Sequence, residues 1–295
     1  MSVEVKPPAQ QESAPRPRLE RGARIPGPVA IGVDARRFFN LTRTLAVTEF
    51  KLRFFGSALG YLWQLMRPLM LFGVLYVVFT HVLKFKSDAA FYPVALLSGV
   101  VIFTFLSEST GTAVTCLVDR ENLVRKVQFP RLVVPLSVTM TAMMNLVLNL
   151  GVVLIFLLAS GGSVRLSWLE LPLLIVVLGL LAAGLSTLLS ALYVRYRDIR
   201  PVWEVLLQIF FYATPIFYTL DLVNNQTIER LMLANPLAAI IQQFRHAVID
   251  PSHPNLVAAA GGWLYVIPPV AVLTLLVVGG YRYFDREAPL IAEDL

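Results

Sequence analysis

The sequence predicts an all-helical membrane protein with six transmembrane helices. Of its 295 residues, 57% are hydrophobic and only 15% are charged, whereas soluble domains average about 45–50% apolar and about 25% charged residues. The mean hydropathy is +0.68. The apolar residues also fall in blocks of about 20, the length that an α-helix needs to cross a bilayer.

Residue counts exclude several classes of site. The single cysteine, Cys116, excludes a disulfide framework and a cysteine-based metal cluster. The histidines His81, His246 and His253 lie far apart, so no histidine-rich metal site is expected. No Gly-x-x-x-x-Gly-Lys-Ser/Thr motif occurs, so we expect no nucleotide cofactor in this chain. The net charge of +6 comes mainly from Lys and Arg residues in the loops between the apolar segments and in the tail, as is typical of membrane proteins. It therefore does not indicate a nucleic-acid partner.

Residues 1–30 are expected to form a disordered cytoplasmic tail. They contain six prolines among Glu, Gln and Arg, and such a segment buries too little apolar surface to offset the entropy of ordering. A partner-binding role for the tail is the alternative. The segment also lacks the apolar core of a cleavable signal peptide. We expect the membrane domain to cover residues 31–284 and a second cytoplasmic tail to cover 285–295.

An amphipathic helix is predicted over residues 38–55. Its apolar side chains share one stripe about 100° wide, made of Phe38, Leu41, Leu45, Leu52 and Phe55. Arg36, Arg43 and Lys51 point away from the stripe. A basic face opposite an apolar face favours a helix lying in the membrane interface, and packing against other protein is the alternative.

Six apolar segments follow and are the predicted transmembrane helices. They cover about residues 65–83, 91–113, 134–158, 169–194, 202–220 and 263–281. At about 1.5 Å per residue, such segments are long enough for a hydrocarbon core near 30 Å.

The positive charges predict the orientation of these helices. With the N-terminus inside, the cytoplasmic parts are residues 1–67, 115–133, 193–201 and 282–295, and they hold 20 of the 25 Lys and Arg residues. Cytoplasmic loops of membrane proteins carry an excess of Lys and Arg. We therefore expect a multi-pass protein with both termini in the cytoplasm.

Two connections between the spans are informative. Residues 119–131 mix both charge signs with apolar side chains and end at Pro130, which forbids continuation of a helix. Exposed Leu123, Val127 and Phe129 would suit a docking surface for a partner, and a basic loop on anionic headgroups is the alternative. The outer connection 221–262 contains an apolar repeat over 237–248 that predicts a short amphipathic or re-entrant helix.

Aromatic side chains form stripes in two of the spans. Phe72, Tyr76 and Phe79 share a face of the first span, and Trp203, Phe210 and Phe217 recur every seven residues in the fifth, beside Phe211, Tyr212 and Tyr218. Such stripes face lipid or pack in the bundle, and they also suit a path for sugar rings, which stack on aromatic faces. Pro215 would loosen the fifth helix.

Glu108 is the main acidic residue at membrane depth. Intramembrane ionisable groups are functional candidates, but pairing with Arg67 explains Glu108 equally well. No second carboxylate or nucleophile accompanies it, and no catalytic constellation is visible elsewhere in the sequence. We therefore expect no enzymatic activity in this chain.

Four segments together resemble the permeases of ATP-binding-cassette polysaccharide exporters. Residues 54–68 are similar to the family's LG-x-x-W…P start of the first span, and residues 123–131 resemble its coupling-helix region. Residues 196–199 and 214–218 (YRDI and TPIFY) resemble its RDI…PI-x-Y signature. Asn235-Pro236-Leu237 with Phe244-Arg245 resembles its segment before the last span. The resemblance covers about residues 36–284.

The resemblance implies a homodimer in the bacterial cytoplasmic membrane, served by two copies of a separate ATPase chain that binds ATP and Mg²⁺. It implies coupling to that ATPase through Asp119, Arg120, Glu121, Asn122, Leu123, Arg125, Lys126, Phe129, Pro130 and Arg131. The first and fifth spans would line the transport path with their aromatic stripes. The outer connection would supply short gate helices.

The cargo implied by the resemblance is a glycan on a polyprenyl-diphosphate lipid, such as O-antigen, teichoic acid or capsule. Its headgroup would meet Arg36, Arg37, Arg43 or Arg53 at the inner interface. More distant relatives move drugs or lipids, which is the alternative for this chain. A secondary transporter would need inverted repeats or several buried acids, and a glycan-synthesising enzyme would need an acidic metal-binding cluster. The sequence shows neither feature.

Overall fold

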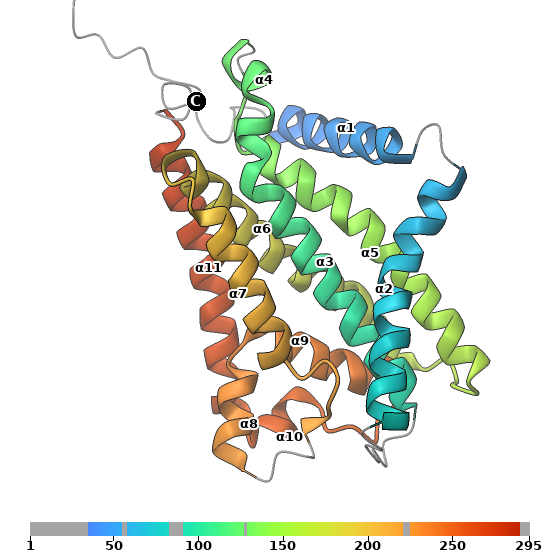
Figure 1. The fold of residues 1–295 in the computed structure, drawn as a ribbon. Helices are drawn as coiled ribbons and strands as arrows, with labels where there is room; N and C mark the ends of the chain where they lie inside the picture. The colour runs from blue at the N-terminus through green and yellow to red at the C-terminus, as the bar shows by residue number, and fades with distance from the viewer. Residues whose placement is uncertain (1–34, 55–57, 83–90, 127–128, 221–224, 290–295) are drawn as a thin grey trace, which may run out of the picture.

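The computed structural model describes residues 35–54, 58–82, 91–126, 129–220 and 225–289. Throughout these ranges the regular structure is helical, without a β-strand (Figure 1). The predicted tail 1–30 lies outside the described residues, as does 290–295 of the predicted C-terminal tail.

Five helical segments are long and apolar enough to cross a membrane, when the described residues are searched by length and composition. They are Leu62–Val82, Tyr92–Asp119, Val133–Ala159, Leu166–Arg195 and Trp263–Glu287. The first segment consists of the part of α2 (Ala58–Val77) from Leu62 onward with η1 (Val78–Val82). The others are, in order, α3 (Tyr92–Asp119), α5 (Val133–Ala159), η2 (Leu166–Glu170) with α6 (Leu171–Arg195), and η5 (Trp263–Val266) with α11 (Ile267–Glu287). They match five of the six predicted spans and confirm an all-helical multi-pass membrane fold.

The fifth predicted span differs from the expectation. Its helix, α7 (Ile199–Ala213), has 15 residues, which gives a length of about 22 Å. The chain leaves the helix at Thr214, whose backbone is extended (φ −90°, ψ 139°). Pro215 explains this end, because proline disfavours helical geometry in the residue before it and supplies no N–H. The prediction of one helix over 202–220 was therefore wrong after residue 213.

The core of the bundle is built around α3. Within its most apolar window, 78% of the residues are buried, and α3 packs against both α5 and α6. Helices α6 and α11 approach closely at Gly184 and Gly280, where a Cβ on Gly280 would lie 2.5 Å from the Gly184 carbonyl oxygen. Small residues allow such backbone approach between membrane helices.

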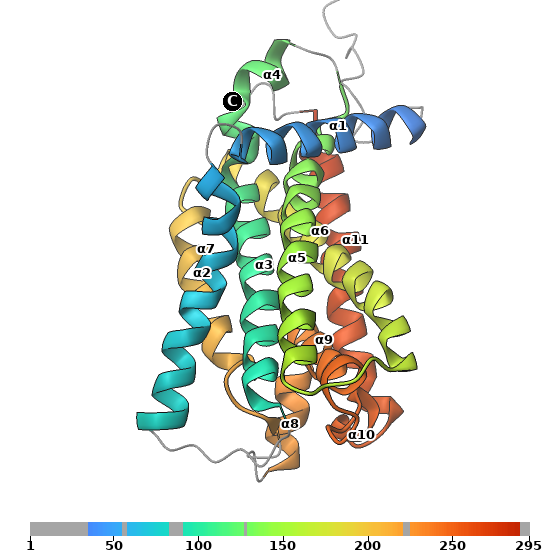
Figure 2. The same cartoon turned by 90° about the vertical axis from the view of Figure 1, so that its right-hand side faces the viewer.

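One helix lies across the end of the bundle. Helix α1 (Ala35–Phe54) runs crosswise at this end and packs mainly against α5, with α4 (Glu121–Lys126) at the same end of the bundle (Figures 1 and 2). We call this the α1 end. The fully buried residues of α1 are Thr42 and Ala46. Of the predicted apolar stripe, Phe38, Leu41 and Leu45 are half-buried and Leu52 is 69% exposed, whereas Phe55 lies outside the described residues.

The opposite end of the bundle, called the α8 end, is capped by short helices. These are α8 (Gln226–Leu233), α9 (Pro236–Phe244), η4 (Arg245–Ile249) and α10 (Leu256–Ala260). The predicted helix over 237–248 corresponds to α9 and η4. Eight of the nine residues of α9 are buried, Gln242 included, and its prediction as an amphipathic or re-entrant helix stays a prediction.

Candidate functional site

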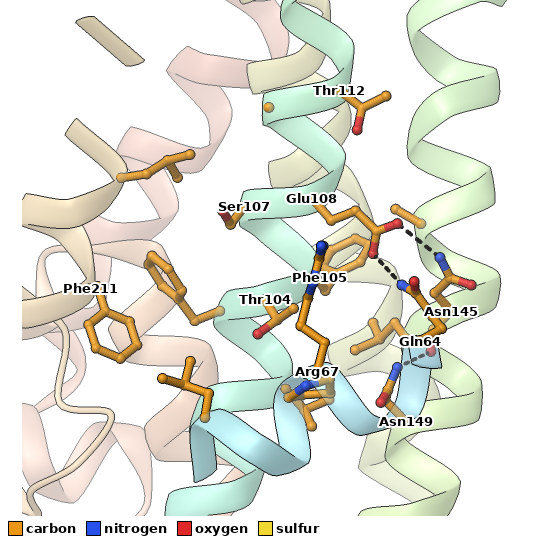
Figure 3. Close-up of a pocket in the computed structure, with 18 of the residues that line it drawn as sticks. Gln64, Arg67, Thr104, Phe105, Ser107, Glu108, Thr112, Asn145, Asn149 and Phe211 are labelled. Atoms are coloured by element: carbon orange, nitrogen blue, oxygen red, sulfur yellow. Dashed lines mark hydrogen bonds between the residues drawn. The ribbon is translucent and has the colours of Figure 1, made fainter. Parts of the chain in front are cut away.

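A pocket of about 820 Å³ lies between α2, α3, α5 and α7. Helices α2 and α7 flank α3 in Figure 1 and lie on the same side of it in Figure 2. The pocket lies between them. Its lining combines amides, hydroxyls, charges and aromatic rings, several of which are shown in Figure 3. The polar and aromatic members are Gln64, Arg67, Phe103, Thr104, Phe105, Ser107, Glu108, Thr112, Asn145, Asn149, Glu204, Gln208, Phe211 and Tyr212.

Glu108 joins four helices at this pocket. Its Oε1 accepts hydrogen bonds from Arg53 Nη1 on α1 (2.5 Å) and from Asn145 Nδ2 on α5 (3.0 Å). Its Oε2 accepts from Gln64 Nε2 on α2 (3.0 Å). Sequence reasoning left the role of Glu108 open between function and pairing with Arg67. The structure pairs it with Arg53, so the pairing with Arg67 was wrong.

Arg67 extends from α2 into the pocket beside Thr104 and Glu108 (Figure 3). The residue is exposed. Within the described part of the chain, neither a carboxylate nor another hydrogen-bond acceptor pairs with its guanidinium. The pocket therefore contains a positive charge that its own described side chains do not neutralise.

Asn145 places an acceptor in the same wall. The residue is 2% exposed, and its Nδ2 donates to Glu108 while its Oδ1 has no hydrogen-bond partner. Asn149, one turn further along α5, donates to the Asn145 carbonyl oxygen (2.9 Å). Buried polar atoms are nearly always paired, so the unpaired Oδ1 atom of Asn145 is an exception in this wall.

The aromatic part of the pocket differs from the predicted stripes. Of the predicted path residues, Phe211 and Tyr212 line the pocket, together with Phe103 and Phe105, which sequence reasoning missed. Phe103 and Phe211 meet edge to face at 5.0 Å between ring centroids. The pattern of α3 gave no signal for Phe103 or Phe105, because residues two positions apart do not share a helix face and so form no aromatic stripe.

The remaining aromatic residues pack within the protein. Phe72 stacks on Tyr76 (5.7 Å) and meets Phe156 of α5 edge to face (6.0 Å). Phe79 stacks on Phe217 at 5.0 Å. Since α7 ends at Ala213, Phe217 does not continue the helical stripe of Trp203 and Phe210. Tyr218 also lies beyond the helix, in contact with Phe217 (5.1 Å).

Trp203 is a structural contact of α7. It is 6% exposed, and its Nε1 donates to Thr110 Oγ1 on α3 (3.0 Å). Phe210, which is 38% exposed, lies 6.3 Å from the Trp203 ring. Trp203 thus fixes α7 to α3 near the pocket and does not face it.

The segment after α7 is held by side chains from distant parts of the chain. Tyr92 donates its hydroxyl to the Phe217 carbonyl oxygen (2.8 Å), and Asn235 Nδ2 donates to Thr214 Oγ1 (3.2 Å). Arg245, only 1% exposed, donates to the carbonyl oxygens of Ile216 and Tyr218. Two motifs that are separate in the sequence, 214–218 and 235–245, therefore form one contact region at the α8 end.

The model of the ABC-2 type transporter family matches residues 40–249. The chain belongs to this family. The match runs from within α1 to the end of η4. It therefore includes every helix that lines the pocket, as well as the segment held by Arg245. The membrane fold and the resemblance drawn from the four sequence motifs are thereby confirmed at the level of the family.

Three relatives of this ABC-2 type transporter are similar over most of their length. O-antigen export system permease protein RfbA of Myxococcus xanthus is 29% identical over 210 residues, which is 71% of this chain and 80% of the relative. A protein of the same name from Klebsiella pneumoniae is 27% identical over 208 residues, or 70% and 79%. Polysialic acid transport protein KpsM of Escherichia coli is 22% identical over 252 residues, or 84% and 93%.

The loop expected to contact an ATPase in this ABC-2 type transporter is tied to α1 and α11. Arg120, at the C-terminal end of α3, forms an ion pair with Glu49 of α1 and donates to Ser137 Oγ of α5 (3.2 Å). Burial lowers the pKa of the Arg120 guanidinium. Arg131 is 5% exposed and donates to the carbonyl oxygen of Ala288, at the end of α11. A cation at that position satisfies a free helix carbonyl.

The other residues predicted for coupling are distributed unevenly. Asp119 accepts a hydrogen bond from Thr115 (2.7 Å). Asn122 is exposed, whereas Glu121, Leu123, Phe129 and Pro130 are half-buried. The ring of Phe129 packs against a cluster of buried apolar residues at the α1 end. Val127 lies outside the described residues, and the described part of Arg125 and Lys126 is their helical backbone in α4.

The four arginines predicted to meet a lipid headgroup all lie on α1 and are exposed. They are Arg36, Arg37, Arg43 and Arg53. Among them, Arg53 is paired with Glu108, a residue of the pocket wall. Arg67, which sequence reasoning treated only as a counter-ion, is the arginine that enters the pocket.

Proposed function

We propose that this chain is the transmembrane subunit of an ATP-binding-cassette exporter for a polysaccharide. The observation that carries the proposal is the pocket between α2 and α7, because it offers what a glycan needs. Amides and hydroxyls bind sugar hydroxyls, and the rings of Phe211 and Tyr212 present apolar faces to the C–H faces of sugars. Export of O-antigen and transport of polysialic acid are named functions of the relatives.

The proposed cargo is a cell-envelope glycan attached to polyprenyl diphosphate. Two copies of the chain would form the path across the bacterial cytoplasmic membrane, with two copies of a separate ATPase supplying ATP and Mg²⁺. The α1 end would face the cytoplasm. The asymmetry in Lys and Arg between the loops supports this orientation, and α1, α4 and residues 195–200 all lie at that end.

Depletion of this protein in its own organism tests the proposal. We expect lipid-linked glycan to accumulate inside the cell and surface polymer to be lost, and a plasmid copy of the gene should reverse both changes. The sugars of the accumulated lipid would identify the cargo. Unchanged surface and lipid-linked glycans would overturn the proposal, and lost drug resistance or lipid flux in the same cells would support a permease for small amphiphiles instead.

A further inference from the structure

The charges around the pocket leave Arg67 unbalanced. Glu108 is paired with Arg53 at 2.5 Å, and Glu204 accepts a hydrogen bond from Arg200 at 3.2 Å. Arg67 has no such partner among the described residues, although it points into the pocket. Arg67 therefore gives the pocket a positive charge that favours an anionic ligand.

The guanidinium is suited to one class of anion in particular. Its planar fork donates two parallel hydrogen bonds to a phosphate or carboxylate, and such charge-assisted bonds are stronger than those between neutral groups. Asn149 and Gln208 contribute further amide groups to the same pocket. The hydroxyl groups of Thr104, Ser107 and Thr112 line the pocket as well and can exchange hydrogen bonds with hydroxyl groups of a ligand. The lining therefore matches a ligand that carries both an anionic group and hydroxyl groups.

The helix faces beside the pocket add a third property. On α2, Met70 is 45% and Val74 is 63% exposed, and on α7, Val205 and Ile209 are each 56% exposed. The polar pocket thus lies between two exposed apolar surfaces in a membrane protein. A soluble anion would use only the pocket, whereas an amphiphile would use the pocket for its head and the apolar surfaces for its tail.

We propose that the pocket binds the phosphate-bearing head of a lipid-linked sugar, with Arg67 pairing to the phosphate. The amide and hydroxyl side chains of the lining bind hydroxyls of the first sugar, the rings of Phe211 and Tyr212 contact the sugar face, and the lipid chain lies against α2 and α7. This inference rests on the proposed function and moves the headgroup site from the arginines of α1 to Arg67. The phosphate chemistry alone also fits an ordinary anionic phospholipid, so the test separates the two sources.

The test measures binding to the full-length chain in nanodiscs of zwitterionic phosphatidylcholine. The probes are polyprenyl diphosphate carrying one sugar, polyprenol without phosphate, phosphatidylglycerol and inorganic diphosphate. We expect the sugar-bearing diphosphate lipid to bind most tightly. Arg67→Ala should weaken its binding about 10- to 100-fold, the range for loss of one charge-assisted contact. Arg67→Lys should weaken binding less, because it keeps the charge and loses the fork.

Matched controls keep the test decisive. Arg282→Ala removes an exposed arginine of α11 outside the pocket and should leave binding unchanged. The thermal unfolding of Arg67→Ala should match that of the wild type, because Arg67 is exposed and makes no described pairing. Wild-type affinity in Arg67→Ala would overturn the proposal. Equal binding of polyprenol would remove the role of phosphate, and equal binding of phosphatidylglycerol would assign the pocket to ordinary membrane lipid.

The remaining outcomes separate this inference from the proposed function. Inorganic diphosphate binding as tightly as the lipid would show a site for soluble anions and overturn the amphiphile assignment. If depletion abolishes glycan export while Arg67→Ala binds normally, the transport function stands and only the Arg67 site is wrong. If depletion leaves glycans unchanged, the proposed function fails whatever the binding data show.

Discussion

Arg245 Nη2 donates a hydrogen bond to the carbonyl oxygen of Ile216 at 2.9 Å, across 29 positions of the sequence. Its Nη1 reaches the Tyr218 carbonyl oxygen at 3.2 Å. Non-helical backbone at membrane depth is tolerated only where other protein groups or water satisfy it. Arg245 supplies donors to the segment where Pro215 ends the helix, and it is itself enclosed by the bundle.

Replacement of Arg245 by methionine should destabilise the protein strongly. The change keeps much of the side-chain length but leaves two buried carbonyl groups without these donors, which we expect to cost about 3 kcal/mol. Thermal unfolding of the detergent-purified protein measures this loss. Arg165→Met is the matched control, because the side chain of Arg165, among the described residues, forms only a long, partly exposed ion pair with Asp250 (3.9 Å). Equal losses in the two variants would contradict the prediction.

Glu108→Gln should weaken the attachment of α1 to the pocket. The amide keeps the shape of the side chain but removes the charge that pairs with Arg53. Because Arg53 is 38% exposed, solvent screens the pair, and we expect a loss of about 1 kcal/mol. Faster hydrogen exchange in α1 would be the specific signature. Glu204→Gln breaks a pair that is 60% exposed on both sides and should leave α1 unchanged.

The two ion pairs of α1 should behave as one unit. Glu49 and Arg53 lie one turn apart on α1. Glu49 pairs with Arg120, which directly follows α3, and Arg53 pairs with Glu108 of α3. Breaking either pair loosens the same helix. Breaking the second pair should therefore lower the unfolding free energy by less than breaking that pair in the wild type. A double-mutant cycle with Glu49→Gln and Arg53→Gln measures this. Strict additivity of the two unfolding free energies would show that the pairs act independently.

Leu123→Asp tests the expected ATPase contact. We predict that it lowers glycan-stimulated ATPase activity and export in the purified complex while thermal unfolding stays close to the wild type, since Leu123 is half-buried on a short helix. Phe129→Asp should reduce both coupling and stability, because its ring packs on a buried cluster. Full activity in a stably assembled Leu123→Asp complex would remove α4 from the contact.

Asp250 should make stability depend on acid pH. Desolvation alone would raise its pKa, but hydrogen bonds from Ser252 and the charges of His253 and Arg165 outweigh it, so the pKa lies below the ordinary value of 3.8. Its contribution is therefore present above about pH 4 and lost as pH falls through the lower folded-state pKa. Asp250→Asn should lower the unfolding temperature at pH 6 and have little effect near pH 2. A constant difference would contradict this assignment.

Local patterns in the sequence predicted the membrane fold well. Apolar length located five spans, and the amphipathic pattern located the helix of α1. The end of α7 was missed although Pro215 was recognised, because a proline in a membrane helix either kinks or ends it according to its neighbours. The buried face of α1 was missed because its position depends on Glu108 and Arg120, which come from another helix.

Most of the pocket was not predictable from one-dimensional patterns. Gln64, Asn145 and Gln208 look like isolated polar residues in three different apolar segments, and only tertiary packing brings them together. The aromatic stripes had a clear period, but period alone does not say which helix a face meets. Glu108 pairs with Arg53 and not with Arg67 because of the angle between α1 and α2. A local sequence pattern does not contain this angle.

The contact between residues 214–219 and 235–245 has a practical consequence for domain exchange among related permeases. The side chain of Asn235 donates to Thr214 Oγ1, and the side chain of Arg245 donates to the carbonyl oxygen of Ile216. A chimera whose crossover lies between positions 219 and 235 would combine one half of this junction with a foreign other half. Crossovers placed before residue 214 and after residue 245 would transfer both halves of the junction from the same parent, so that the two halves stay compatible with each other.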